Sequence, residues 1–278
     1  MNVSFEFFPP KTAEGLAHLV ETAKRLNRFA PEYFSVTYGA GGGTQDLTVN
    51  TLSALQNNRL RVAPHISCIG ATKAKIAALL QYYQTQGVKQ LVALRGDLPS
   101  GQGSLAGDFR YAKDLVAFIR ETTGDAFHIR VAVYPEAHPQ ARNLQKDLEH
   151  FKEKVDAGAD SAITQYFYHP EAYAKLVDDC RALDIDIPIV PGIMPIQNFS
   201  QLSRFSEMCG AEIPRYIRKR MEVFGDDSVS IQNFGIEIVT HLCEAVMNMG
   251  APSLHFYTLN KDKLVTQILE NLQCTQTL

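Results

Sequence analysis

The sequence lacks the features that mark membrane, disulfide-rich and nucleic-acid-binding proteins. Its longest apolar runs, such as residues 185–193, are interrupted by Asp186 and Pro188 and fall well short of the roughly 20 residues that a membrane-spanning helix requires. The five cysteines form no C-x-x-C pair and are odd in number, which argues against a zinc knuckle and against a disulfide framework. A net charge of −3 with dispersed basic residues gives no nucleic-acid footprint. No signal peptide precedes the first predicted strand, so we expect a cytoplasmic protein that binds small molecules.

Several catalytic motifs are also missing. No G-x-S-x-G nucleophile elbow occurs, and residues 39–44 read G-A-G-G-G-T, which lacks the third glycine of a dinucleotide-binding fingerprint. No lysine lies inside a predicted strand, which weakens a Schiff-base mechanism. His65 and His138 could bind metal, but without metal-ligand spacing we predict hydrogen bonding and no metal. A carboxylic acid, hydrogen-bond donors and aromatic rings remain, and this set suits a bound organic cofactor.

Strand and helix patterns alternate along the whole chain. No change of composition or Pro/Ser-rich linker divides it, which predicts one α/β domain over residues 1–278. Eight repeats favour a closed (β/α)8 TIM barrel over an open sheet. Helical patterns at residues 217–224 and 236–246 predict extra helices between the seventh helix and the eighth strand. The strands are predicted at residues 3–8, 33–38, 61–68, 90–94, 129–134, 161–167, 187–193 and 254–257.

The first predicted strand carries a single carboxylate among aromatic residues. Phe5, Phe7 and Phe8 favour a buried strand, and Pro9 ends it, so Glu6 lies near the carboxyl end. A carboxyl group surrounded by aromatic rings loses solvation in its charged form, which should raise its pKa toward the range of a general acid. The alternative is a glutamate that faces solvent or pairs with a basic neighbour.

Polar residues recur where the predicted strands end. In a TIM barrel the chemistry gathers at the carboxyl ends of the strands and in the loops that follow. We therefore expect one site built from Glu6, Thr37, His65, Arg95, Asp97, Tyr134, His138, Gln165 and Lys261.

Seven short motifs, in this order, resemble those of the 5,10-methylenetetrahydrofolate reductase family. They are FEFFPP at residues 5–10, VTYG at 36–39, APH at 63–65, LRGD at 94–97, YPEAHP at 134–139, ITQ at 163–165 and HFYTLN at 255–260. The resemblance implies a (β/α)8 barrel that contains FAD. It also implies hydride transfer from NAD(P)H to FAD in a ping-pong reaction, and then from the flavin to methylenetetrahydrofolate, giving 5-methyltetrahydrofolate.

The resemblance assigns roles to individual residues. Glu6 is implied to protonate the folate nitrogen, and Asp97 to lie near flavin and pterin as a fixed negative charge. The residues implied to bind substrate are Gln165, Gln201, Phe205 and Lys261, although Phe205 also fits an ordinary core stripe. The residues implied to surround FAD are Thr37, His65, Arg95, Gly96, Asp97, Tyr111, Ala112, Tyr134, His138, Asp147, His150 and Lys154. Asp147, His150 and Lys154 share one flank of a predicted helix. The alternative is that this flank faces solvent and contacts no cofactor.

The chain departs from the family pattern at a few positions. His150 stands where Asn is expected and Glu153 where Arg is expected, with Arg142 and Lys146 as alternative phosphate contacts. Lys261 stands where Arg is usual, so a guanidinium group that can donate two parallel hydrogen bonds is replaced by an ammonium group that acts as a point charge.

Several properties and two alternatives follow from the resemblance. It implies a homo-oligomer, often a tetramer, and a short form without a regulatory domain. It favours NADH, although the sequence does not decide between NADH and NADPH. The alternatives are another flavin-dependent barrel reductase and a non-catalytic protein that binds folate or flavin.

Overall fold

The strands form a barrel with a single parallel sheet. The structure, a computed structural model, describes residues 1–38, 45–96 and 107–275. Its strands follow one another in the order β7-β6-β5-β4-β3-β2-β1-β9-β8, and every pairing between neighbours is parallel. The strands are β1 (Val3–Phe7), β2 (Phe34–Val36), β3 (Val62–Ser67), β4 (Gln90–Leu94), β5 (His128–Val133), β6 (Ser161–Thr164), β7 (Ile189–Val190), β8 (Gly192–Ile193) and β9 (Leu254–Tyr257).

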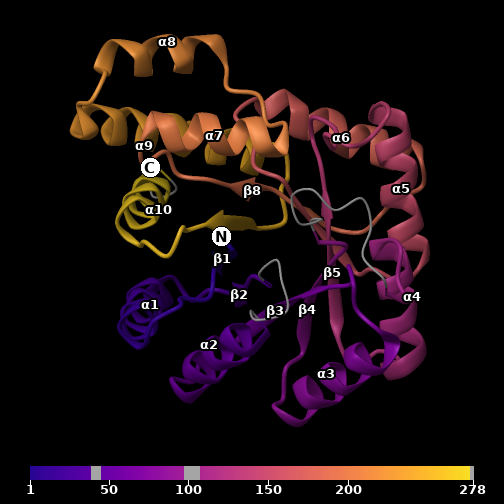
Figure 1. The fold of residues 1–278 in the computed structure, drawn as a ribbon. Coiled ribbons are helices and arrows are strands. Elements are labelled where there is room, and N and C mark those ends of the chain that lie inside the picture. The colour runs from indigo at the N-terminus through magenta and orange to yellow at the C-terminus, as the bar shows by residue number, and fades with distance from the viewer. Residues whose placement is uncertain (39–44, 97–106, 276–278) are drawn as a thin grey trace.

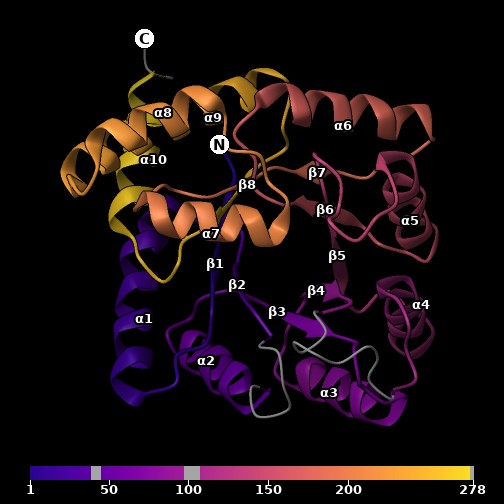
Figure 2. The same cartoon turned by 45° about the horizontal axis from the view of Figure 1, so that its top comes forward.

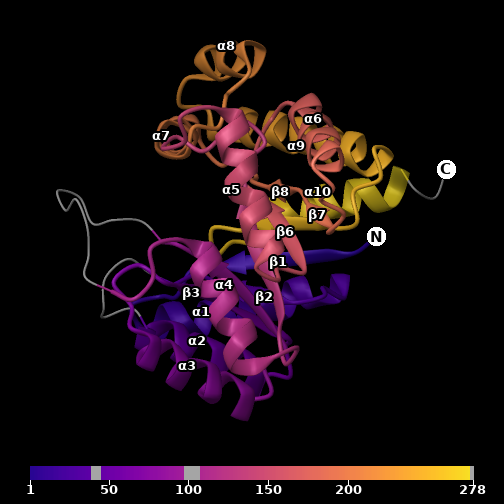
Figure 3. The same ribbon diagram turned by 90° about the vertical axis from the view of Figure 1, so that its right-hand side faces the viewer.

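Helices surround the strands. Figures 1 and 2 show them as a ring around the sheet. Figure 3 shows the barrel from the side, and Figures 1 and 3 show α8 outside the ring, above α7 and α9. None of the helices in the described part of the chain is long and apolar enough to cross a bilayer. They are α1 (Ala13–Leu26), a 3-10 turn (Asn27–Phe29), α2 (Gln45–Asn57), α3 (Lys73–Thr85), α4 (Ala112–Thr123), α5 (Leu144–Asp156), α6 (Pro170–Ala182), α7 (Phe199–Cys209), α8 (Arg215–Phe224), α9 (Ser228–Asn248) and α10 (Lys263–Thr275).

The barrel closes at its seventh strand position, where Pro191 divides the extended chain into two short strands. β7 pairs with β6 and β8 pairs with β9, so one extended segment joins both ends of the sheet. The carbonyl of Pro191 accepts a hydrogen bond from His255 N at this junction. Gly192 is required here because a Cβ would lie 2.2 Å from the carbonyl oxygen of Thr164. The predicted (β/α)8 barrel is therefore confirmed.

β1 shows how the sequence separates the core from the barrel interior. Successive side chains of a strand point to opposite faces. Val3, Phe5 and Phe7 are fully buried, and Phe34 packs against the rings of both phenylalanines at 5.7 Å. The intervening Ser4 and Glu6 therefore lie on the opposite face, toward the barrel axis.

Many predicted boundaries of strands and inserted helices differ from the structure by one or two residues, and two differ by more. β6 ends at Thr164 and not at residue 167, because the side-chain oxygen of Gln165 accepts a hydrogen bond from Tyr166 N and turns the chain. The second inserted helix begins at Ser228, eight residues before the predicted start at 236. Asp227 caps it by accepting hydrogen bonds from Val229 N and Ser230 N. Both extra helices, α8 and α9, lie between α7 and β9 as predicted.

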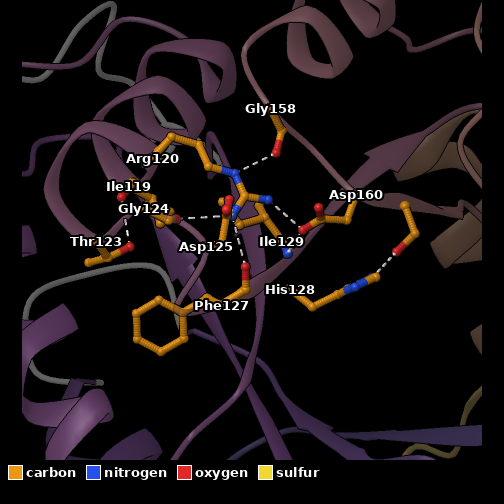
Figure 4. Close-up of polar contacts among 11 residues, drawn as sticks. Ile119, Arg120, Thr123, Gly124, Asp125, Phe127, His128, Ile129, Gly158 and Asp160 are labelled. Carbon is orange, nitrogen blue, oxygen red and sulfur yellow. Dashed lines mark hydrogen bonds and ion pairs between the residues drawn. The ribbon is translucent and has the colours of Figure 1, made fainter.

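A polar cluster around Arg120 joins α4 to the amino ends of β5 and β6 (Figure 4). The guanidinium group donates to the carbonyls of Gly158 and Phe127, both at 2.9 Å, and to the Asp160 carboxylate at 2.5 Å. Asp160 also accepts from Ile129 N at 2.6 Å. Because this cluster lies at the end of the barrel opposite the strand carboxyl ends, we assign it a structural role.

Candidate functional site

A cavity of about 480 Å³ opens at the carboxyl ends of the strands. This size suits a small-molecule or cofactor site. It brings together most of the predicted site residues, from elements far apart in the sequence. Those that line it are Glu6, Thr37, His65, Arg95, Gly96, Ala112, Tyr134, His138, Lys154, Gln165 and Phe205.

Glu6 lies on the floor of this cavity between two histidines. Its Oε2 is 3.2 Å from His65 Nε2 and 3.4 Å from His255 Nε2. His255 makes a hydrogen bond to the carboxylate, whereas His65 is close without meeting the angle that a hydrogen bond requires. The carboxylate therefore has a hydrogen-bonding neighbour and a second polar contact, both buried.

The predicted direction of the Glu6 pKa was wrong. Burial alone would raise it, but the charge interaction with His65 and the hydrogen bonding of His255 prevail and lower the pKa to about 2. The prediction failed because Phe5 and Phe7 alternate with Glu6 and point to the other face of the sheet. The immediate neighbours of the carboxyl group are imidazole rings and not phenylalanine rings.

His255 and Ser4 extend the Glu6 contact deeper into the barrel. Nδ1 of His255 lies 2.7 Å from the hydroxyl oxygen of Ser4, and Ser4 pairs with His255 in the register of β1 and β9. Burial lowers the pKa of His255, which favours the neutral ring. A neutral ring that donates from Nε2 to Glu6 must accept at Nδ1, and the Ser4 hydroxyl can donate there. The motif containing His255 was recognised, but this residue and Ser4 were not predicted as site residues. Each lies two positions along its strand from a residue whose face of the sheet was predictable, and residues two apart share a face. That spacing was the signal that could have identified both.

The loop after β5 carries two of the predicted cofactor residues, Tyr134 and His138. His138 N donates to the Asp147 carboxylate at 2.8 Å, so Asp147 fixes the loop from α5 without lining the cavity. Arg95, at the end of β4, donates to the side-chain oxygen of Gln140 at 2.5 Å. Gly96 follows it with φ +86°, and a Cβ there would lie 2.0 Å from Ser67 Oγ. Only glycine fits this position.

Lys154 is a half-buried cation in the cavity wall. Its Nζ donates to the carbonyl of Ala132 at 2.5 Å, and burial lowers its pKa to about 8, partly offset by the charge of Asp147. No carboxylate lies within ion-pair distance of it among the described residues. A partly desolvated ammonium group without an ionic partner favours an anionic ligand.

The exposed side of α5 does not reach the cavity. His150 Nδ1 lies 3.3 Å from the Glu153 carboxylate, which also pairs with Lys113 of α4 at 3.1 Å. Glu153, which stands where an Arg was expected, thus pairs with the Lys113 cation of α4 and lies beside His150 of its own helix. The ring of Tyr111, the N-cap residue of α4, stacks near His150 with centroids 6.4 Å apart. Tyr111 and His150 lie outside the cavity lining, and of the predicted flank of Asp147, His150 and Lys154 the last alone lines the cavity.

The four predicted substrate residues divide into two groups. Gln165 and Phe205 line the cavity, so Phe205 is not confined to the core stripe of α7. Gln201 lies at the start of α7, where its N–H donates to the Asn198 side chain, and it does not line the cavity. Lys261 Nζ donates to Gln197 Oε1 at 2.6 Å on the exposed rim, also outside the lining. Asp97 and the glycine-rich segment 39–44 lie outside the described residues.

Other residues line the cavity without having been predicted. They are mainly apolar or aromatic side chains whose types do not distinguish a cavity wall from a core. The set is Tyr38, Val92, Ala93, Leu94, Ala132, Ile163, Tyr166, Met194, Tyr257 and Leu259. Tyr257 also donates to the Thr164 carbonyl at 2.7 Å across the barrel seam. In the described part of the chain, no cluster of three His, Cys, Asp or Glu side chains is arranged to hold a metal ion.

Comparison with known proteins gives consistent relatives. The family described as methylenetetrahydrofolate reductase matches residues 1–273. "Methylenetetrahydrofolate reductase (NADH) 1" of Arabidopsis thaliana is 41% identical over 282 residues, which cover 97% of this chain and 48% of the plant protein. The 5,10-methylenetetrahydrofolate reductase of Escherichia coli (strain K12) is 39% identical over 273 residues, covering 98% of this chain and 90% of that protein. The chain thus spans about half the length of the plant relative and most of the bacterial one.

Solved structures share the fold at low sequence identity. A Clostridium thermocellum protein described as binding two copies of 5-methyl-5,6,7,8-tetrahydrofolic acid superimposes with a TM-score of 0.67 at 16% identity, covering 99% of this chain and 95% of that one. Dihydropteroate synthase of Xanthomonas albilineans gives a TM-score of 0.53 at 12% identity, covering 99% and 91%. Both similarities support the barrel architecture.

Proposed function

The chain belongs to the methylenetetrahydrofolate reductase family, and we propose that it reduces 5,10-methylenetetrahydrofolate to 5-methyltetrahydrofolate with electrons from NAD(P)H and with FAD as cofactor. The observation that carries this proposal is the placement of Glu6, hydrogen-bonded from behind by His255, on the floor of a cavity whose wall also holds the half-buried Lys154. A proton donor and an anion-binding group would then serve one reaction site.

The cavity residues fit a flavin dinucleotide. Lys154, half-buried and without an ionic partner among the described residues, would hold a phosphate oxygen. Ala112, the first residue of α4, also lines the cavity, and a helix amino end favours a bound anion. Arg95 and His138 would hold the polar edges of the cofactor from the neighbouring loops. When bound, FAD supplies a carrier that takes a hydride from the nicotinamide and gives it to the folate.

The residues on the floor would manage the proton that folate reduction needs. The five-membered ring of methylenetetrahydrofolate opens to an iminium after protonation at a ring nitrogen, and the iminium accepts hydride. Glu6 would donate that proton, with His255 and Ser4 as the hydrogen-bonded groups behind it. Gln165 can donate and accept at the amide-like edge of a pterin. Phe205 offers a ring on which a substrate could stack.

One site would serve both substrates in turn. Glu6, Gln165 and Phe205 line the same cavity as the proposed cofactor residues, so nicotinamide and folate would reach the flavin through the same mouth. This arrangement supports a ping-pong reaction. We propose NADH as the donor because the plant relatives are named as NADH enzymes. The folate ligand of the Clostridium thermocellum protein supports a folate substrate on this fold. We further propose a cytoplasmic homo-oligomer.

Purification and anaerobic half-reactions test the proposal. The protein should be yellow, with the absorption bands of oxidised flavin, and NADH should bleach them. Methylenetetrahydrofolate should then restore the bands and yield 5-methyltetrahydrofolate. Recovery with a quinone and none with the folate would indicate another flavin-dependent barrel reductase. Folate and flavin binding without any turnover would indicate a binding protein.

A further inference from the structure

Phe8 is an exposed aromatic residue at the mouth of the barrel. Its side chain is 47% exposed, whereas Phe5 and Phe7 of the same strand are fully buried. Exposure of a single apolar side chain is ordinary, but this one directly follows the strand that carries Glu6. Whether Phe8 can contact a ligand in the cavity depends on the face of the strand to which its side chain points.

The backbone hydrogen bonds show that the strand alternation continues through Phe8. The Glu6 carbonyl accepts from Thr258 N on the β9 side, and the Phe7 carbonyl accepts from Thr37 N on the β2 side. The backbone N–H and carbonyl of Phe8 again point to the β9 side, where both make hydrogen bonds with the side chain of Asn260. Pro9 also keeps Phe8 extended. Phe8 therefore lies on the same face as Glu6, about 7 Å closer to the mouth at roughly 3.3 Å per residue.

The Asn260 side chain clamps the backbone of Phe8 with two hydrogen bonds on the β9 side. Its Oδ1 accepts from Phe8 N at 3.0 Å and its Nδ2 donates to the Phe8 carbonyl at 2.8 Å. The side-chain amide thus replaces the backbone neighbour that a longer β9 would have supplied. The clamp fixes where Phe8 stands relative to Glu6.

The clamp belongs to a turn with an unusual backbone. Leu259 and Asn260 both have positive φ, at 53° and 58°. Left-handed conformations are uncommon for residues other than glycine, and Asn tolerates them better than Leu. Such conformations concentrate at functional sites, and Leu259 lines the cavity. The turn therefore connects the cavity wall to the support of Phe8.

We propose that Phe8 is a substrate contact for the aminobenzoyl ring of the folate, and that Asn260 is its positioning residue. This inference rests on the proposed function. If Glu6 protonates the pterin on the cavity floor, the aminobenzoyl group, joined to the pterin through a short link, extends toward the mouth. Phe8 lies beyond the cavity lining on that side and offers a ring to it.

Ligand truncation separates this contact from the rest of the site. The flavin-loaded protein is titrated with 5-methyltetrahydrofolate and with 6-methyltetrahydropterin, which lacks the aminobenzoyl group. Phe8→Ala should weaken binding of 5-methyltetrahydrofolate about fivefold to tenfold, the range of an aromatic contact, and leave the pterin unchanged. Phe8→Tyr should restore wild-type binding. Val223→Ala, at another exposed apolar residue on α8, is the matched control.

Substitution of the clamp tests the positioning role. Asn260→Gly removes both hydrogen bonds and also relaxes the left-handed backbone, so a loss cannot arise from new strain. It should reproduce the loss seen with Phe8→Ala, and the double variant should be no worse than either single variant. Additive losses would overturn the role of Asn260.

Other outcomes contradict the proposal. Equal binding of 5-methyltetrahydrofolate by Phe8→Ala and wild type would overturn it, as would a loss confined to NADH. If Phe8→Ala forms a smaller assembly by light scattering and binds folate as the wild type does, Phe8 contacts another subunit and not the folate. If the wild-type protein binds no folate at all, the proposed function fails instead.

Discussion

Nε2 of His255 lies 3.4 Å from Oε2 of Glu6, and the carboxylate that it contacts is ionised far below neutral pH. The pKa of Glu6 is lowered to about 2 and that of His255 is also lowered, which favours an ionised carboxylate beside a neutral imidazole, so the resting pair lacks an acidic proton at neutral pH. A proton donor in this position must therefore take up its proton during the reaction cycle. This requirement leads to the first two predictions.

Glu6→Gln should separate the two half-reactions. The amide keeps the size of the side chain but cannot deliver a proton, so the flavin should still bind and NADH should still reduce it. Reoxidation by methylenetetrahydrofolate should fall by at least about 100-fold, the usual contribution of a general acid. Stopped-flow absorbance of the flavin measures both rates. Folate reduction at the wild-type rate would refute the assigned role.

The rate of folate reduction should fall as pH rises. Glu6 and His255 both have lowered pKa values, so the protonated pair becomes rarer with each pH unit above them. The logarithm of kcat/KM for methylenetetrahydrofolate should approach a slope of −1 between about pH 7 and pH 9. The NADH half-reaction, which needs no proton from this pair, serves as the internal control. A flat profile for the folate half-reaction would contradict the assignment.

Lys154→Met should weaken flavin binding at least tenfold, because a charge-assisted hydrogen bond contributes about 1.5–3 kcal/mol. The dissociation constant for FAD is measured by quenching of flavin fluorescence. Lys152→Met provides the matched control, since Lys152 is on the same helix but pairs with Asp156 at 3.1 Å on the surface.

The same lysine predicts a pH dependence of flavin binding. Its pKa of about 8 means that the charged form, which attracts an anion, declines as pH rises through 8. FAD affinity of the wild type should therefore fall above about pH 8, and this decline should be absent in Lys154→Met. An identical decline in both proteins would exclude Lys154 as its origin.

Arg120→Met should lower the free energy of unfolding by about 2–3 kcal/mol. The change removes the hydrogen bonds to Gly158 and Phe127 and leaves the partly buried Asp160 without its cation. Chemical denaturation followed by circular dichroism measures the effect. Arg181→Met, which removes an exposed pair with Asp178, should cost less than about 0.5 kcal/mol. Equal losses in the two variants would contradict the structural role.

Much of the fold was predictable because helix and strand periods are local properties of the chain. The strands at Gln90–Leu94 and Leu254–Tyr257 have the predicted bounds. Pro191 shows the limit of this reasoning: the sequence predicts one seventh strand, whereas the structure divides it so that each half pairs with a different neighbour. Pairing partners depend on barrel closure, which no local pattern encodes.

The sequence by itself determined the alternation of strands and helices, the position of Glu6 near the carboxyl end of β1, and the motifs that carry the family resemblance. Only the tertiary structure decided what surrounds Glu6. Its neighbours His65 and His255 lie 59 and 249 positions away in the sequence, and the charge interaction with His65 and the hydrogen bond with His255 outweigh the effect of burial on the pKa. A pKa depends on distances across the barrel, so the adjacent aromatic residues in the sequence gave the wrong direction.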